Sequence, residues 1–160
     1  MARRKITAAD ICEVTGYTRD QLRGLLQKLP PYADRAGSPR IAREFSRHDL
    51  LVLSIAIRLE AKLGLQRAAI GAVVEQIYAE LHKPRAMTPS PLLHISLDPP
   101  SITYLTNKQV EIEGTMIALE PVFKLVDDYL DGDIAENVLQ PSLPFGPSLA
   151  SQRRQYFSGK

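Results

Sequence analysis

Residues 7–31, TAADICEVTGYTRDQLRGLLQKLPP, contain two short helix patterns separated by a turn. Thr7 is a favoured helix N-cap, apolar residues follow it on one helical face, and Gly16 is of the type that commonly ends a helix. Thr18 is the next N-cap, and leucines then recur at helical spacing until two prolines prevent continuation. The stretch therefore predicts two capped helices on either side of the turn Thr15-Gly16-Tyr17.

The second predicted helix has an apolar leucine stripe that we expect to pack against the first helix. The polar residues left facing outward are Arg19, Gln21, Arg23 and Lys28. An exposed helix with arginine and glutamine offers bidentate donors to base edges in the major groove of DNA. The same pattern is also compatible with a plain helical hairpin whose charges are solvated.

Residues 32–45 predict a short hairpin, or wing, with Gly37-Ser38-Pro39 at its tip. Three arginines lie in this segment: Arg35, Arg40 and Arg43. Arginines on a projecting loop suit contacts to phosphates or to the minor groove. Ser46 and Asp49 then form a capping-box pattern ahead of an apolar helix, Gly64-Leu65 breaks it, and residues 66–81 predict a further amphipathic helix.

The charge of the chain is unevenly distributed. Residues 1–67 contain 13 Lys or Arg and 7 Asp or Glu, which gives a net charge of +6. Residues 68–136 contain 4 Lys or Arg and 11 Asp or Glu, which gives a net charge of −7. A basic first third indicates a polyanionic partner for that part of the chain. No apolar run approaches membrane-spanning length and the first residues do not resemble a secretory signal, so we expect a cytoplasmic protein.

The order of these parts resembles the DNA-binding head of the MerR family over residues 5–77. The matching residues are Ile6-Thr7, Val14 to Thr18, Leu22-Arg23, Arg43 to Leu50, Leu63-Gly64-Leu65 and Ile70. The resemblance implies that Thr18, Arg19, Gln21 and Arg23 lie on a recognition helix and that Arg40 and Arg43 on the wing hold the DNA backbone. The chain differs from the family at Gly24-Leu25, where aromatic residues are usual, and at Lys83-Pro84, which ends the helix before any long dimerising coiled coil.

The second half predicts a small antiparallel sheet closed by a helix. Strand patterns occupy residues 92–97, 102–106, 110–113 and 115–119, with turn residues at 98–101 and 107–109, and a helix is expected over residues 121–130. The fold class predicted is therefore α+β, with an N-terminal winged helix-turn-helix, this sheet and helix, and a disordered tail.

The predicted domains are a winged-helix unit with its following helices over residues 1–83, a proline-rich linker over 84–91, a sheet and helix module over 92–131, and a tail over 132–160. A few short strands cannot bury both sheet faces on one helix, and exposed edges invite pairing. We therefore expect the second half to mediate homodimerisation. A small-molecule effector pocket is conceivable in this half, but no ligand motif supports one.

Catalytic and metal-binding patterns are not found in the sequence. Its three histidines, His48, His82 and His94, have no partner at metal-ligand spacing, and Cys12 is the only cysteine. No phosphate loop, nucleophile elbow or pair of catalytic carboxylates is recognisable. We therefore expect a protein that is not an enzyme and needs no cofactor or metal.

These features together predict a dimeric, sequence-specific regulator of transcription that binds double-stranded DNA. The recognition helix would enter the major groove and the wing would contact the backbone or minor groove. The alternative is a winged-helix phage or accessory protein that assembles on DNA, or recruits a protein partner, without regulating transcription.

Overall fold

The computed structural model of the chain describes residues 5–34, 43–85, 88–106 and 113–139, with the side chains of the last range described as far as Gly132. These residues form an α+β fold of six helices and a three-stranded antiparallel sheet. Three short helices, α1 (Ala8–Thr15), α2 (Arg19–Leu26) and α3 (Pro30–Ala33), precede the longer α4 (Arg47–Ala61) and α5 (Arg67–His82). Strands β1 (Leu92–Leu97), β2 (Pro100–Leu105) and β3 (Thr115–Ala118) then lead into α6 (Glu120–Leu139).

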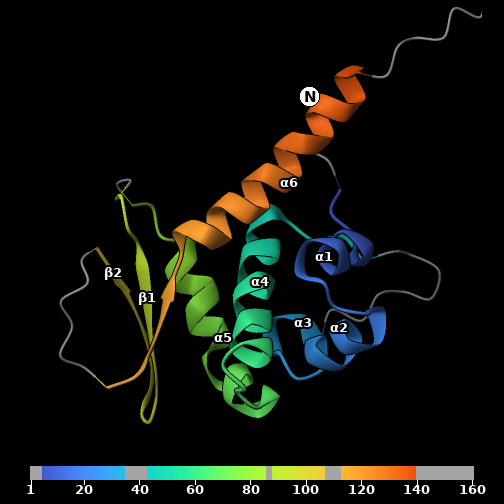
Figure 1. The fold of residues 1–160 in the computed structure, drawn as a ribbon. Coiled ribbons are helices and arrows are strands. Elements are labelled where there is room, and N and C mark those ends of the chain that lie inside the picture. Colours follow the sequence, from blue (N-terminus) through green and yellow to red (C-terminus); the bar gives the residue numbers. More distant parts are fainter. Residues whose placement is uncertain (1–4, 35–42, 86–87, 107–112, 140–160) are drawn as a thin grey trace, which may run out of the picture.

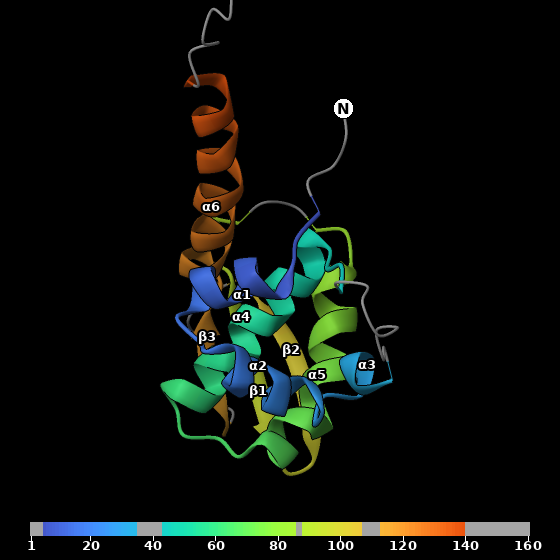
Figure 2. The same ribbon diagram turned by 90° about the vertical axis from the view of Figure 1, so that its right-hand side faces the viewer.

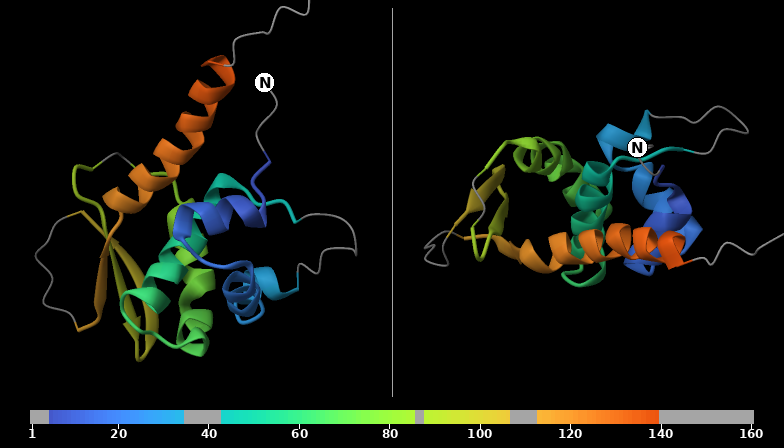
Figure 3. Two further views of the ribbon diagram at one scale, coloured as in Figure 1. Left: turned by 45° about the vertical axis from the view of Figure 1, so that its right-hand side comes forward. Right: turned by 90° about the horizontal axis from the view of Figure 1, so that it is seen from above.

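The helices α4 and α5 form the middle of the molecule, with α1, α2 and α3 on one side and the sheet on the other (Figure 1). Turning the molecule places the three short helices in front of the sheet, with α4 and α5 between them (Figure 2). Seen from above, α6 runs from the sheet past α4 to α1 (Figure 3). The helix α6 therefore bridges the two ends of the layered arrangement.

The first helix begins and ends where the sequence predicts, and the second begins as predicted but ends at Leu26, before the prolines. At α1 the Asp10 carboxylate accepts hydrogen bonds from the backbone N–H and the hydroxyl of Thr7, both at 2.6 Å, and Gly16 ends the helix at φ 76°. At α2 the Thr18 hydroxyl accepts from the Gln21 N–H at 3.2 Å, while the Gln21 side-chain oxygen accepts from the Thr18 N–H at 2.9 Å. Only residues 16–18 separate the two helices.

The predicted hairpin over residues 32–45 is wrong at its beginning, because Tyr32 and Ala33 belong to the short helix α3. Pro30 and Pro31 suit a first helical turn, where a missing N–H removes no hydrogen bond. The N–H groups of Tyr32 and Ala33 both donate to the carbonyl of Leu29 at 2.9 Å. The centre of the predicted wing, with Arg35 and Arg40, lies outside the described residues.

The end of this segment is tied to the start of the chain. The backbone N–H of Phe45 donates to the carbonyl of Ile6 at 2.8 Å, and both side chains are buried. Ser46 then caps α4, since its hydroxyl accepts from the Asp49 N–H at 3.0 Å and its own N–H donates to the Asp49 carboxylate at 2.8 Å. The predicted capping box and the start of α4 are therefore confirmed.

The helix α4 is buried along most of its length. Residues 49–57 are all buried, because α1, α5 and α6 pack around the helix. A helix that is apolar on all sides is stable only when it is enclosed in this way. The predicted break at Gly64, which has φ 67°, and the predicted helix of about residues 66–81 are also confirmed.

The sheet has the strand order β2-β1-β3, so β1 is central. Leu93 lies opposite Tyr104 on β2 and Ile117 on β3. The predicted strands at 92–97 and 115–119 are confirmed to within one residue. The predicted turn at 98–101 is too long, since β2 already begins at Pro100, and most of the predicted turn and strand over 107–113 lies outside the described residues.

The sheet does not stand apart from the N-terminal half. Residues of the sheet, including Leu93, Ile95 and Ile117, belong to the same hydrophobic core cluster as Ile70 and Ile77 of α5. One face of the sheet is therefore covered by α5, a partner that periodicity in the sequence does not identify. The described residues on either side of the predicted linker share one core and do not form two separate packing units.

The last helix is longer than predicted. The helix α6 runs to Leu139, so the expectation of a disordered tail is wrong for residues 132–139, and residues 140–160 lie outside the described part. The Tyr129 hydroxyl donates to Asp10 Oδ1 at 2.7 Å and to Glu13 Oε2 at 3.1 Å, and Arg47 forms an ion pair with Asp127. These contacts to α1 and α4 support a helix that its own sequence pattern defines weakly.

Candidate nucleic-acid interface

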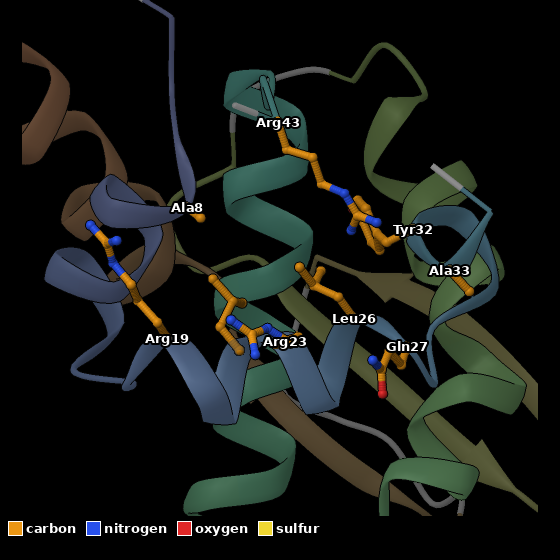
Figure 4. Close-up of a pocket in the computed structure, with 9 residues that line it drawn as sticks. Ala8, Arg19, Arg23, Leu26, Gln27, Tyr32, Ala33 and Arg43 are labelled. Carbon is orange, nitrogen blue, oxygen red and sulfur yellow. The ribbon is translucent and has the colours of Figure 1, made fainter. Parts of the chain in front are cut away.

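A depression of about 560 Å³ lies along α2 on the side of the molecule formed by the short helices (Figure 4). Apolar side chains of α2 and α3 form part of its lining, together with three arginines. The lining residues are Ala8, Arg19, Leu22, Arg23, Leu26, Gln27, Tyr32, Ala33 and Arg43. No acidic residue lines it among the described residues, so the depression is suited to an anionic partner.

Two separate segments supply these arginines. Arg19 and Arg23 are four residues apart on α2 and therefore share one helix face. Arg43 comes from the segment that leads into α4, whose position is set by the backbone bond between Phe45 and Ile6. Figure 4 shows the side chains of Arg23 and Arg43 directed toward the depression from these two segments. Folding thus brings together three of the residues predicted to bind DNA.

The charge of Arg23 is only weakly compensated. Its guanidinium lies 3.5 Å from the Asp20 carboxylate, and the two side chains are 71% and 89% exposed. An exposed pair of this kind contributes about 0–1 kcal/mol and breaks readily when a better partner binds. Arg23 is therefore available for a phosphate or a base edge.

The remaining predicted residues lie elsewhere. Gln21 and Lys28 are exposed on α2 and just after it, but they do not line the depression. The Gln21 oxygen is engaged in the N-terminal cap, which leaves its amide N–H groups to face a ligand. Thr18 is the cap residue itself. Arg35 and Arg40 lie outside the described residues.

Tyr32 and Gln27 also line the depression, although the sequence pattern does not indicate them. The sequence pattern predicts that Tyr32 lies in the wing, whereas it lies in α3 and its ring is buried beside Phe45, with ring centroids 6.5 Å apart. The proline pair before it is the one signal that could have indicated a helical turn. Gln27 follows Arg23 by four residues, so helical spacing alone would have placed it on the same face.

No protein-family model, curated protein or solved structure matches this chain.

Two of the histidines, His48 and His82, lie side by side in the structure. Among the described residues no group of three or more His, Cys, Asp or Glu side chains could hold a metal ion. The His48 ring contacts the Tyr78 and His82 rings, and its Nε2 lies 2.9 Å from the Tyr78 carbonyl. The buried His94 is paired through Nε2 with the Glu113 carbonyl at 3.0 Å. Within the described ranges no helix is long and apolar enough to cross a membrane.

Tyr17, in the turn before α2, gives a testable pH dependence. Burial, and then the neighbouring Glu60 carboxylate, raise the pKa of its phenol from 10 to about 12. Because the native pKa is the higher one, the native state holds this proton more tightly than the unfolded chain. The resulting stabilisation is present below the unfolded pKa of about 10 and is lost as the pH rises through the native pKa of about 12.

We therefore expect the free energy of urea unfolding to fall more steeply for the parent protein than for Tyr17→Phe between about pH 9 and about pH 12. Because all other titrating groups are common to both proteins, the difference between the two curves isolates Tyr17. Parallel curves would contradict the assigned environment of this side chain.

Proposed function

We propose that this protein is a dimeric, sequence-specific DNA-binding regulator of transcription, in which α1 and α2 act as a helix-turn-helix and the segment containing Arg43 acts as part of a wing. The observation that carries the proposal is that Arg19, Arg23 and Arg43, from two segments of the chain, line one depression along α2. Recognition of duplex DNA needs a helix that can enter the major groove and cations beside it that hold the phosphates.

The different roles of Arg23 and Arg43 follow from the segments that carry them. Arg23 projects from the middle of an exposed, eight-residue helix, where a side chain can reach a guanine edge in the groove. Arg43 lies beside the helix on a different segment, as expected for a residue that contacts the sugar-phosphate backbone. Arg23 is therefore assigned to base reading and Arg43 to phosphate binding.

Dimerisation is part of the proposal because one such helix reads only a few base pairs, and paired half-sites multiply specificity. The sheet offers a surface for it. The face of the sheet away from α5 exposes Met116 (44%) and Ala118, and β2 and β3 are the outer strands of the described sheet. Unpaired strand edges and apolar faces of this kind favour self-association.

The alternative function is recruitment of a protein partner, or assembly on DNA, without sequence recognition. The uncharged part of the depression favours it, since the exposed Gln27 and Ala33 would also suit a protein segment. Binding through phosphates alone is insensitive to sequence and weakens steeply with salt.

Selection from a random duplex pool with the purified full-length chain, together with its mass in solution, tests the proposal. We expect an inverted motif with half-site centres about one helical turn apart, or a multiple of it, bound by a dimer. A monomer that enriches no motif and releases DNA as salt rises from about 50 mM to about 200 mM would contradict the regulator and favour the alternative.

A further inference from the structure

We infer that Arg67, the first residue of α5, is a positioning residue that sets the orientation of α2 by placing its guanidinium against the α2 backbone at Gly24. The inference rests on the proposed function, because it concerns how α2 is held while it reads DNA. In the sequence Arg67 lies far from α2, and no sequence pattern links it to that helix.

The contact at Gly24 requires the absence of a side chain. A Cβ atom built on Gly24 would lie 2.4 Å from Nη1 of Arg67 and 3.5 Å from its Cζ. A glycine inside a helix costs about 1 kcal/mol relative to alanine, so its presence within α2 needs a local reason. The guanidinium that occupies the space of the missing Cβ supplies that reason.

Glu60, near the end of α4, holds the guanidinium in place. The Nε of Arg67 donates to Oε1 of Glu60 at 2.8 Å, and the two side chains are only 33% and 23% exposed. The second carboxylate oxygen of Glu60 is buried, and the same carboxylate lies beside the Tyr17 phenol. Arg67 is therefore the compensating charge for Glu60 as well as the group in contact with α2.

The ion pair of Glu60 and Arg67 also lies beside the turn that precedes α2. Tyr17 lies next to both Glu60 and Arg67, close enough that each affects its titration. The turn and the middle of α2 are thus supported by one pair of side chains from α4 and α5. Since α2 has only eight residues, its orientation depends on such tertiary contacts more than on its own helix propensity.

Arg67 acts from outside the binding surface. Neither Gly24 nor Arg67 lines the depression, whereas the adjacent residue Arg23 does. A small rotation of α2 would displace the end of the long Arg23 side chain, and a bidentate contact to a base tolerates little displacement. Loss of the Arg67 contact should therefore reduce discrimination between sequences and leave phosphate binding unchanged.

The first test compares the parent protein with Arg67→Met and Glu60→Gln on the selected duplex and on a shuffled duplex. We expect the ratio of the two dissociation constants to fall about tenfold in each variant, the effect of about one bidentate contact, with an unchanged dependence of log Kd on log salt. A salt slope reduced by about one with an unchanged ratio would overturn the inference, because Arg67 would then be a phosphate contact.

The second test perturbs the contact from α2. Gly24→Ala should displace the guanidinium and cause a similar loss of discrimination, yet cause no further loss in an Arg67→Ala background, where the obstructing group is absent. The clash involves only the end of a flexible side chain, so we expect Gly24→Ala to fold, as urea unfolding would verify. Equal effects of Gly24→Ala in both backgrounds would overturn the inference.

The outcomes for the parent protein separate the two proposals. A parent protein that selects no motif would overturn the proposed function and the positioning role together. A parent protein that selects a motif, with Arg67 and Gly24 variants that discriminate as well as it does, would overturn only the positioning role.

Discussion

Replacing Arg23 by alanine is expected to lower the preference of the protein for its selected site by about 10-fold to 100-fold, the range of one bidentate base contact. Arg23 is 71% exposed on α2 and forms an ion pair with the exposed Asp20. The variant should keep its affinity for shuffled duplex, because that affinity comes from phosphate contacts. Fluorescence anisotropy with both duplexes at one salt concentration measures the change.

Arg43→Ala is the complementary variant and should weaken binding to both duplexes about equally. Its salt slope should fall by about one, as expected when one phosphate contact is lost. Lys124→Ala serves as the control, since Lys124 is an exposed cation on α6 that does not line the depression. If Arg23→Ala and Arg43→Ala bound DNA no differently from this control, the binding surface would be assigned to the wrong face.

Gly71→Ala is expected to destabilise the protein by about 1–3 kcal/mol, the usual cost of overpacking a well-packed contact. A Cβ at Gly71 would lie 2.5 Å from the carbonyl oxygen of Lys28, between α2 and α3. This obstacle is backbone and cannot rotate away, so α5 would have to move. Urea unfolding of the full-length chain measures the loss as a lower midpoint at an unchanged m-value.

Gly132→Ala is the matched control for this prediction. Gly132 is an exposed residue inside α6, and a Cβ there would meet nothing within 4 Å. The same chemical change should therefore stabilise the protein by about 0.5–1 kcal/mol through helix propensity alone. Equal effects of the two substitutions would show that α5 does not approach Lys28 as closely as the structure has it.

Gly24 and Gly71 explain why α5 is important for the position of α2 and of the depression along it. Gly71 allows the backbone of α5 to approach the end of α2, and Gly24 allows Arg67 of α5 to contact α2 itself. Both contacts fall on the flank of α2 away from the depression. The face carrying Arg19 and Arg23 is therefore left exposed while the opposite flank is supported.

Helices whose ends are marked by a capping residue or a glycine were predicted well at those ends. The caps at Thr7, Thr18 and Ser46 join residues three positions apart, so the energy that starts each helix is contained in a few adjacent residues. The glycines that end α1 and follow α4 act equally locally, through positive φ. Secondary structure of this kind depends little on the rest of the chain.

Elements that depend on distant contacts were predicted less well. The prediction that Tyr32 lies in a hairpin is wrong, because burial of its side chain against Phe45 and the core favours a helical turn there. The sequence predicts too early an end for α6, because acidic residues near 127–131 resemble a solvated helix end, whereas the helix runs to Leu139. In the structure Asp127 pairs with Arg47, and Tyr129 donates to carboxylates of α1.

The sequence by itself determined the start of most helices, the strands of the sheet, and the basic character of the N-terminal third, because capping, periodicity and charge are properties of neighbouring residues. Only the tertiary structure decided that Arg43 joins Arg19 and Arg23, that the sheet packs on α5, and that Arg67 contacts α2 at Gly24. These are contacts between residues far apart in the chain. The energy of these contacts depends on how helices and strands pack around one core, so a pattern of neighbouring residues cannot predict them.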